Sequence, residues 1–469
     1  MSGGTASAGG FNGYAAGSYT IGVTYNGDSN NNTASTSTTL TISMATPSVS
    51  DTCSPNPITY GGSNSICTGY ASDSGTVTGT LSFTINGSPW ATETLSSGSA
   101  TAPQFSSTYG IGTYTVGVAY SGDSNNNAAS SSTTLTIGKA SQTINFAAPA
   151  SPVTYGVSPI ALSATASSGL AVIFSVSSGP CSVSGSTLTV TGAGTCVVAA
   201  NQAANTDYSA AATVSHSILV NAAVLTVTAN NASRVYGVAN PTFTAYFSEF
   251  VNGDTSSVLN GAPSLTTTAT PTSAPGSYTI TAAVGTLAAS NYTFSFVNGT
   301  LTVTAATQTI SFTAPASPVT YGVAPISLSA TASSGLAVIF SVSSGPCTVS
   351  GNTLTLVGAG TCVVAANQPG NADYTAAVAV VQSVVINKES VIVNSTSSLS
   401  PSIYGDNVAL TFTLTGSGVT PTGTVTINDG ANTLATISLD AGIATYNTSA
   451  LIAGKHTLTA VYSGDNNYQ

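Results

Sequence analysis

Six cysteines are the side chains with the clearest potential chemistry in this sequence, because paired thiols can oxidise to disulfides. They fall into pairs separated by 14, 15 and 15 positions: Cys53 and Cys67, Cys181 and Cys196, and Cys347 and Cys362. Local pairs in an even count predict three intradomain disulfides and an exported protein. The alternative is three pairs of small buried thiols. No Cys-x-x-Cys occurs and neither histidine lies near a pair, so zinc is not expected.

Aspartates in recurring turns are a second set of candidates. Gly-Asp-x-Asn follows a strand pattern at Asp28, Asp123 and Asp465, and the matching loops of other segments carry Asp207 and Asp373. Such loops could offer oxygen ligands to Ca²⁺, which takes six to eight of them. One carboxylate per loop is few for that purpose, and Asp and Asn also build turns by bonding to their own backbone. We expect turns, with Asp28, Asp123 and Asp465 as calcium candidates and no metal site assigned.

Nothing in the sequence predicts catalysis. His216 lies in an alternating strand pattern, and His456 stands where other segments have a tyrosine. Neither has a recurring nucleophile or acidic partner, and no phosphate-binding glycine loop opens a helix. We therefore predict a protein that is not an enzyme and needs no cofactor.

Three further side chains have a binding or cross-linking interpretation that we rank below a structural one. Trp90 is the only tryptophan and follows a hairpin turn, so it is a candidate ligand contact, although ordinary packing is favoured. Lys139 and Lys388 lie at segment boundaries. An isopeptide cross-link would need a lysine inside each domain, so we do not expect one.

A Tyr-Gly signal organises the whole chain. Five copies recur at a regular step, at Tyr60, Tyr155, Tyr236, Tyr321 and Tyr404, with steps of 95, 81, 85 and 83 residues. A near-constant step predicts five copies of one structural unit. A tyrosine offers a large ring and a hydroxyl that can bond to the backbone, and glycine permits positive φ. We therefore predict a packing role for this signal and no ligand site.

A second recurring position lies on a later strand. Tyr19 and Tyr114 occupy it in Gly-x-Tyr patterns, whereas Cys196 and Cys362 occupy it in Gly-x-Cys patterns. The substitution predicts that a covalent bond replaces a buried aromatic ring in some units. Closing a loop of about 15 residues stabilises a fold by roughly 3 kcal/mol.

Composition excludes several classes of function. Only 4% of the residues are charged, and four Lys and Arg stand against fourteen Asp and Glu, for a net charge of −10. Without a basic stripe, binding to nucleic acid or to anionic lipid is not expected. No run of about 18 apolar residues occurs, so no membrane insertion is expected within this segment.

Period-two alternation dominates the chain. Val408, Leu410, Phe412 and Leu414 alternate with small or hydroxyl residues, as apolar residues do in many other runs. Such alternation, between Gly-, Asn- and Pro-containing turns, predicts β-strands with one buried face. The fold class we predict is all-β: tandem immunoglobulin-like sandwiches that form an elongated rod, on the order of 150–200 Å long at about 3.3 Å per strand residue.

Repeat boundaries divide the chain into six segments, and residues 167–176 return unchanged as 333–342. The first segment lacks its front half and the last lacks its final strand, so we expect a piece of a longer protein whose signal and anchor lie outside it. The segments are 1–44, 45–138, 139–222, 223–305, 306–388 and 389–469.

These segments resemble bacterial Ig-like repeats of secreted and surface proteins. Residues 112–125, with Gly-Thr-Tyr-Thr-Val and Tyr-Ser-Gly-Asp-Ser-Asn, resemble the group 3 type, which we assign to 45–138 and 389–469, with 1–44 as the C-terminal part of a truncated Ig-like domain. The repeated residues 167–176 and 333–342, and the run 349–361, resemble the group 2 type, assigned to 139–222 and 306–388. Segment 223–305, with Tyr236-Gly237 and Asn291-Tyr292-Thr293, resembles the MBG type.

The resemblance implies a structural stalk or adhesin-type region of a bacterial extracellular or cell-surface protein, without catalytic residues. We expect a monomeric rod, with surface glycans or proteins as candidate partners. Two alternatives stay open. The chain could be an array of carbohydrate- or protein-binding modules, or an accessory region of a larger extracellular enzyme.

Overall fold

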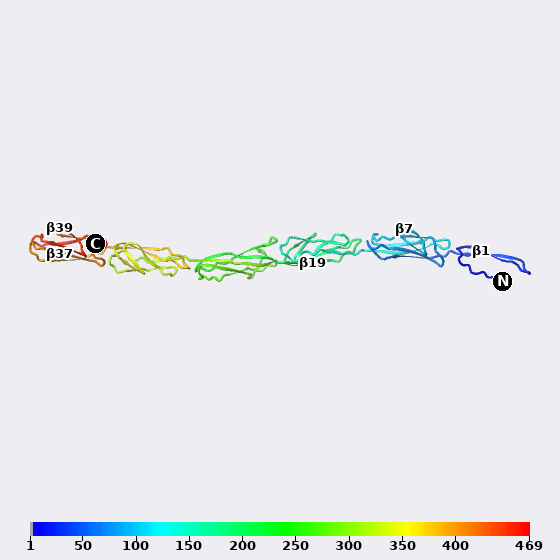
Figure 1. The fold of residues 1–469 in the computed structure, drawn as a ribbon, viewed down its shortest axis with the longest axis horizontal. Coiled ribbons are helices and arrows are strands. Elements are labelled where there is room, and N and C mark those ends of the chain that lie inside the picture. Colours follow the sequence, from blue (N-terminus) through cyan, green and yellow to red (C-terminus); the bar gives the residue numbers. More distant parts are fainter. Residues whose placement is uncertain (1–2) are drawn as a thin grey trace. The chain divides into compact units, whose positions relative to one another are not determined.

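The computed structural model describes residues 3–469, and almost all of its regular structure is β-strand. The one helical element among these residues is a short 3₁₀ turn, η1 (Ser256–Val258). The chain divides into two compact units. The first covers residues up to 224 together with 251–254 and 289–293, and the second covers 225–250, 255–288 and 294–469. Each of the sandwiches described below is one continuous stretch of sequence, as the colours of Figure 1 show, and residues 251–254 and 289–293 of the third sandwich belong to the first unit.

The first unit begins with an antiparallel hairpin. Strands β1 (Gly17–Tyr25) and β2 (Ala34–Ile42) pair in register from Gly17 opposite Ile42 to Tyr25 opposite Ala34. Most of their side chains are exposed, because no second sheet covers them among the described residues.

Sandwich I consists of β3 to β10, in the sheets β3-β5-β8 and β4-β10-β9-β6-β7. Leu81, Phe83 and Val118 fill one part of its core, and Phe105 and Leu135 fill another. Its strands are β3 (Ser48–Ser54), β4 (Ile58–Thr59), β5 (Ile66–Ser72), β6 (Thr80–Ile85), β7 (Ser88–Thr94), β8 (Ser99–Thr101), β9 (Gly112–Tyr120) and β10 (Ala129–Gly138).

Sandwich II consists of β11 to β19, in the sheets β11-β14, β12-β19-β18-β15 and β13-β17-β16. Leu188, Val198 and Ile218 are fully buried in it. Its strands are β11 (Ile144–Phe146), β12 (Val153–Thr154), β13 (Ile160–Ala161), β14 (Ala164–Ala166), β15 (Ile173–Ser178), β16 (Cys181–Ser184), β17 (Thr187–Val190), β18 (Gly194–Asn201) and β19 (Val214–Asn221).

Sandwich III consists of β20 to β26, in the sheets β22-β20-β25 and β21-β26-β24-β23. Ile280, Leu301 and Val303 lie in its core. Its strands are β20 (Ala223–Ala229), β21 (Ala232–Val235), β22 (Ala245–Ser248), β23 (Ser264–Thr266), β24 (Gly276–Ala283), β25 (Tyr292–Val297) and β26 (Gly299–Thr304).

Sandwich IV consists of β27 to β35 and repeats the sheet order of sandwich II, as β27-β30, β28-β35-β34-β31 and β29-β33-β32. Its strands are β27 (Ile310–Phe312), β28 (Val319–Thr320), β29 (Ile326–Ser327), β30 (Ala330–Ala332), β31 (Ile339–Ser344), β32 (Cys347–Ser350), β33 (Thr353–Leu356), β34 (Gly360–Asn367) and β35 (Val380–Asn387).

Sandwich V consists of β36 to β41, in the sheets β36-β37-β40 and β39-β38-β41. Val408, Leu410, Phe412 and Leu414 of β37 are all buried, as the alternation predicts. Its strands are β36 (Ile392–Ser397), β37 (Val408–Thr415), β38 (Thr424–Asp429), β39 (Asn432–Ser438), β40 (Ile443–Thr448) and β41 (Leu458–Tyr462). The predicted all-β class of tandem sandwiches is confirmed.

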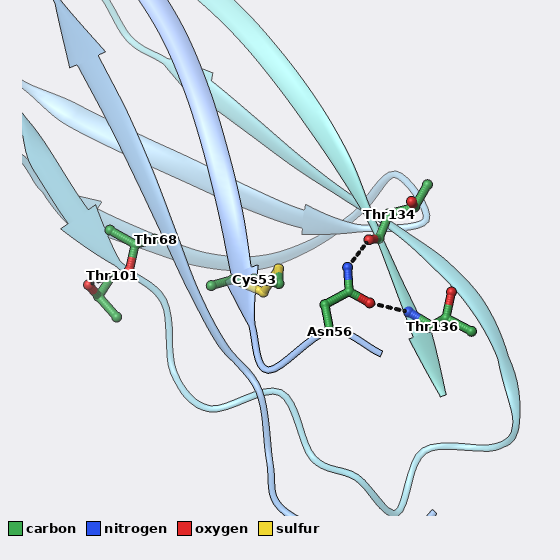
Figure 2. The surroundings of a disulfide bond; sticks show 7 residues. Cys53, Asn56, Thr68, Thr101, Thr134 and Thr136 are labelled. Carbon is green, nitrogen blue, oxygen red and sulfur yellow. Dashed lines mark hydrogen bonds between the residues drawn. A yellow bond between two sulfur atoms is a disulfide. The ribbon is translucent and has the colours of Figure 1, made fainter. Parts of the chain in front are cut away.

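Three disulfides are present, and they are of two kinds. Cys53 and Cys67 lie directly opposite each other on β3 and β5, within one sheet, with Cα atoms 4.0 Å apart. Beside this bond the Asn56 amide donates to the carbonyl of Thr134 (2.6 Å) and its Oδ1 accepts from the N–H of Thr136 (3.1 Å), as Figure 2 shows. The Asn56 side chain thereby ties the loop after β3 to β10.

The other two disulfides cross between sheets. Cys181 of β16 is bonded to Cys196 of β18, with Cα atoms 6.0 Å apart, and Cys347 of β32 to Cys362 of β34, at 5.9 Å. Both Cys196 and Cys362 are fully buried. Each bond therefore links the two sheets that enclose a core, which a bond within one sheet cannot do.

At the Gly-x-Tyr position a hydrogen bond takes the place of a disulfide. The hydroxyl of Tyr114 donates to the carbonyl of Gly110, four residues upstream, at 2.6 Å, and that of Tyr278 donates to Ala274 at 2.8 Å. This is the arrangement of a tyrosine corner. Sandwich I has both Tyr114 at this position and a disulfide. Its disulfide lies within one sheet and does not occupy the position of the ring.

His456 takes the tyrosine's place in sandwich V. Its Nε2 lies 2.7 Å from the carbonyl oxygen of Ile452, again four residues upstream, and its Nδ1 lies 2.5 Å from Oδ2 of Asp429. Both ring nitrogens thus face acceptors, and only the imidazolium can donate to both. The Ile452 carbonyl, and then the Asp429 carboxylate, raise the pKa of His456 above 6.5.

Removing an intersheet disulfide should weaken one sandwich selectively. In the variant C347A/C362A we expect sandwich IV to lose roughly 3 kcal/mol of stability, the value for a loop of about 15 residues. Hydrogen exchange of the β34 amides in the full chain measures this loss. The β18 amides of sandwich II, whose disulfide is intact, are the control. Equal protection of β34 in variant and wild type would contradict a stabilising role.

Sandwich V should lose stability as the pH rises. A raised pKa means that the stabilisation by protonated His456 is complete below the unfolded-state value of about 6.5 and is lost as the pH passes the folded-state value. We expect faster exchange of the β41 amides, after correction for intrinsic rates, at a pH of about 8.5 than at about 5.5. The variant H456Y, which restores a tyrosine corner, should remove this dependence. A dependence that persists in H456Y would assign it to another group.

Candidate functional site at the ends of the sandwiches

The Tyr-Gly tyrosines lie where the chain leaves a sandwich. The short strand before four of them, Tyr60, Tyr155, Tyr236 and Tyr321, pairs in parallel with the last strand of its sandwich, as β12 does with β19 and β28 with β35. The Tyr155 N–H then donates to the carbonyl of Asn221 at 2.9 Å, and the Tyr321 N–H to that of Asn387 at 2.9 Å. Tyr60 and Tyr236 make the same bond in their sandwiches. The backbone pairing therefore places each ring beside the exit of the chain.

A second set of tyrosines lies where the chain begins the following sandwich. Each belongs to a tight turn, and we call them the turn tyrosines: Tyr208, Tyr292, Tyr374 and Tyr468. In sandwich V the N–H of Asp465 donates to the carbonyl of Tyr468 at 3.0 Å, and Glu389, near the start of the sandwich, bridges to Tyr468. Ala140 and Ala306 bridge to their turn tyrosines in the same way.

Each turn tyrosine contacts the Tyr-Gly tyrosine of the preceding sandwich, edge to face. The ring centroids lie 6.0 Å apart for Tyr60 and Tyr208, 5.7 Å for Tyr155 and Tyr292, 5.6 Å for Tyr236 and Tyr374, and 5.6 Å for Tyr321 and Tyr468. Interplanar angles of 78–90° match the preferred T-shaped geometry, which adds about 0.5–1.5 kcal/mol to the burial of area. We call each such contact a junction.

At the junction between sandwiches II and III both rings, Tyr155 and Tyr292, are buried, and we call such a junction closed. Oδ2 of Asp254 accepts from both hydroxyls, at 3.1 and 2.9 Å, and the Val251 N–H donates to the hydroxyl of Tyr292 at 3.0 Å. Burial raises the pKa of Tyr292, so its hydroxyl stays protonated and can donate to Asp254.

The junction between sandwiches IV and V is closed by the same means with different partners. Tyr468 is 0% exposed and Tyr321 is 5% exposed. The Gly418 N–H donates to the Tyr468 hydroxyl at 3.0 Å, and the Val419 N–H to the Tyr321 hydroxyl at 3.3 Å. Burial raises the pKa of Tyr468 as well.

Both closed junctions also use an asparagine next to the turn tyrosine. Oδ1 of Asn291 accepts from the N–H of Ala193 at 3.0 Å, and Oδ1 of Asn467 accepts from the N–H of Ala359 at 2.9 Å. Both alanines lie in Gly-Ala-Gly loops that lead directly into the strands of the buried cysteines. The near-duplicate sandwiches II and IV thus present the same donor to the next sandwich.

The space around the glycine after the Tyr-Gly tyrosine differs between the two closed junctions and the other two, which we call open. Gly156 has φ +92°, and a Cβ there would lie 2.6 Å from Cβ of Val251. Gly322 has φ +89°, and a Cβ there would lie 1.6 Å from Oγ of Ser417. At Gly61 and Gly237, in sandwiches I and III, nothing lies within 4 Å. The four tyrosines of those two open junctions are only half-buried.

Linker lysines bond to the turns without forming cross-links. Nζ of Lys139 donates to the carbonyl of Asn205 at 2.5 Å, and Nζ of Lys388 donates to the carbonyl of Asp465. Each bond fastens the linker to the turn that holds the next tyrosine. The turns that contain Asp207 and Asp465 are therefore part of the junctions.

The calcium candidates accept hydrogen bonds from their own loops and, at Asp123 and Asp465, also from Thr78 and Thr422 of another loop. The two carboxylate oxygens of Asp123 accept from the N–H groups of Thr78 and Asn125, each at 2.8 Å, and these bonds hold its pKa below the ordinary value. Asp28 accepts from the Tyr25 hydroxyl at 2.6 Å, which is the main cause of its lowered pKa.

Asp465 repeats the arrangement in sandwich V. Burial raises its pKa, but the N–H donors of Thr422, Asn467 and Tyr468 together outweigh burial and leave the pKa below the ordinary value. Within residues 3–469, no group of three or more His, Cys, Asp or Glu side chains is placed to hold a metal ion.

Other sequence candidates pack inside single sandwiches. Trp90 contacts Phe83 and Phe105 edge to face, at 6.3 and 5.9 Å, and lies against both parts of the sandwich I core. Nε2 of His216 lies 3.0 Å from the carbonyl oxygen of Phe146. In the part of the chain that the structure describes, no helix has the length and apolarity needed to cross a membrane.

The sequence analysis identified the Tyr-Gly tyrosine of each junction but not the turn tyrosine. The turn tyrosines were not recognised, although a signal exists. Each follows Asn or Asp, and their steps of 84, 82 and 94 residues resemble the steps of the Tyr-Gly signal. Two tyrosine series with one period indicate a repeated contact between neighbouring units.

Two segments match known families. Residues 225–302 match the model of the MBG domain (YGX type), and residues 395–469 match the bacterial Ig-like domain (group 3). The predicted recognition of these two types is confirmed. The group 2 resemblance of 139–222 and 306–388 stays a prediction. No curated protein matches the sequence.

Several solved structures have similar folds at low identity. Immunoglobulin domains 1–5 of Sidekick-1 share 13% identity (TM-score 0.23) over 88% of this chain and 98% of that one. The Clostridium thermocellum CbhA fibronectin(III)-like modules share 16% (TM-score 0.17) over 36% and 94%. Drosophila N-cadherin EC1-3 shares 8% (TM-score 0.16) over 46% and 89%. The matched bacterial Ig-like families and the three disulfides fit a structural or adhesion-type extracellular region.

A side chain at Gly156 should open the closed junction. The variant G156A places Cβ against Val251, whereas the control G237A meets open space at a similar φ of +82°. Both carry the strain of an L residue at positive φ, about 1–2 kcal/mol. Only G156A should expose the Ala193 N–H, because its bond to Asn291 spans the junction. Hydrogen exchange at Ala193 measures the effect. Unchanged protection in G156A would show that the junction does not depend on this contact.

Proposed function

We propose that this chain is a structural stalk of a bacterial extracellular or cell-surface protein, which holds a functional part away from its anchor. The observation that carries the proposal is the repeated junction. All four tyrosine pairs use the same two positions of neighbouring sandwiches, and two of them are closed by further hydrogen bonds. Such contacts restrict bending between neighbours, which is a property that a spacer needs and a flexible tether lacks.

Domain boundaries belong to the same proposal. We place them at 45–138, 139–222, 223–305, 306–388 and 389–469, with 1–44 as the last part of a further domain. Support comes from the linker bonds, since Lys139 and Lys388 each donate to the turn of the sandwich that follows. We assign the group 2 type to 139–222 and 306–388 because they share their sheet order and their intersheet disulfide.

The proposed mechanism is mechanical and needs no catalytic group or cofactor. Each core is locked by a tyrosine corner, an intersheet disulfide or the equivalent histidine, and each end is locked to its neighbour by a tyrosine pair. Low charge leaves few ionic contacts, so the stalk should resist changes in salt. A surface location, with no nucleic-acid partner, accords with the acidic balance and with the disulfides.

Small-angle X-ray scattering of the full chain tests the stalk. A monomeric rod of five sandwiches should have a maximum dimension on the order of 150–200 Å, at about 35 Å per sandwich. A compact chain of this length would instead have a radius of gyration of about 23 Å. Scattering close to that compact value, or a maximum dimension that shrinks at physiological salt, would overturn the stalk. The oxidised and reduced proteins should be compared, because the proposal needs intact sandwiches.

A further inference from the structure

Sandwich V carries the fifth Tyr-Gly signal, and this copy has no tyrosine packed against it in the described residues. Tyr404 is 74% exposed, in contrast to the buried Tyr155 and Tyr321. Ile403 and Ile452 beside it are 78% and 72% exposed. Together with Gly405 and Ala453 they border a shallow hollow of about 170 Å³ at this end of the sandwich. An exposed cluster of this kind commonly marks an interaction site.

The glycine at this end has the same backbone conformation as the glycines of the closed junctions. Gly405 has φ +94°, close to +92° at Gly156 and +89° at Gly322. A Cβ at Gly405 would meet nothing within 4 Å, because the neighbour that fills this space at Gly156 and Gly322 is absent here.

The donor of the closed junctions is present as well. Ala453 precedes Gly454 as Ala193 precedes Gly194 and Ala359 precedes Gly360, and all three glycines have a similar positive φ of 131–151°. Ala193 and Ala359 each donate to an asparagine of the next sandwich. Across residues 3–469, no acceptor is bonded to the Ala453 N–H.

The open junctions show that this donor is not a general feature. In sandwich III the corresponding residue is Pro275, which has no N–H, and the residue before the next turn tyrosine is Asp373. In sandwich I the residue before the glycine is Ile111, and the residue before the next turn tyrosine is Asp207. Alanine at this position donates to an asparagine of the following turn in all three of its paired occurrences, since Ala16 also donates to Oδ1 of Asn125 at 2.8 Å. The residue after that asparagine is a tyrosine at Asn291 and Asn467, the two junctions with a Tyr-Gly tyrosine.

We propose that the Tyr404 end of sandwich V is a docking surface for another β-sandwich that presents an Asn-Tyr turn. The tyrosine of the partner packs edge to face on Tyr404, and the Oδ1 of its asparagine accepts from the Ala453 N–H. Ile403 and Ile452 lose their exposed apolar surface against the partner. The proposal concerns one surface and does not require that the whole chain act as a stalk.

The chain itself supplies a suitable probe. A protein of residues 223–469 contains every strand of sandwiches III to V, and its Asn291-Tyr292 turn is no longer covered by sandwich II. The probe carries Y404S so that it cannot bind itself. Dispersed amide signals of the probe establish that it is folded. The labelled protein is the full chain with ¹⁵N-alanine, observed by NMR.

A tethered neighbour acts at an effective concentration in the millimolar range, so the probe is added to about 1 mM. We expect the Ala453 amide signal to shift as its N–H gains an acceptor. Binding should be lost in the full-chain variant Y404S, which keeps its fold because the side chain it replaces is exposed. Binding should weaken about tenfold with probe N291A, as for loss of one hydrogen bond. The Ala193 and Ala359 amides, whose N–H groups already have acceptors, serve as internal references.

Three results would overturn the proposal. The first is an Ala453 signal that does not move at about 1 mM probe. The second is a shift that survives Y404S or is the same with probe N291A. The third is a shift that appears when the unlabelled full chain, whose two Asn-Tyr turns are covered, replaces the probe, since this would mean association of two copies through another contact.

Discussion

Backbone pairing between the second and last strands of a sandwich is the interaction on which the junctions depend. The short strand before each occupied Tyr-Gly signal runs parallel to the last strand, and the tyrosine N–H bonds to the final carbonyl before the linker. Because the linker is only a few residues long, this bond places the ring next to the following sandwich. A side chain of fixed position can then meet a partner of fixed position, and the contact can repeat.

Closed and open junctions differ in small residues rather than in the tyrosines. All four ring pairs have nearly the same separation, yet burial is complete only where glycine admits a neighbouring side chain and alanine offers an N–H to asparagine. Both closed junctions follow sandwiches with an intersheet disulfide. The loop that carries the alanine leads directly into the strand of the buried cysteine, so the disulfide also steadies the donor of the junction.

Polar chemistry in this protein is directed at the backbone. With 4% charged residues, few ion pairs are available, and the aspartates, asparagines and tyrosine hydroxyls instead bond to N–H and carbonyl groups. The same preference explains the aspartate turns, whose oxygens are occupied by local N–H donors. His456 is the exception: an imidazolium replaces the hydroxyl of a tyrosine corner, and the Ile452 carbonyl and the Asp429 carboxylate raise its pKa above the ordinary value.

The sequence by itself determined the β-fold, the number of units and the cysteine pairs, because alternation, repeat step and local spacing are properties of the chain alone. It also predicted a packing role for Tyr155 and its copies. It did not reveal what they pack against, since Tyr292 lies 137 positions away in a different sandwich. Only the tertiary structure decided that Cys53 bonds within a sheet while Cys181 bonds across sheets. The distance between strands depends on how the sheets stack, and spacing in sequence carries no record of it.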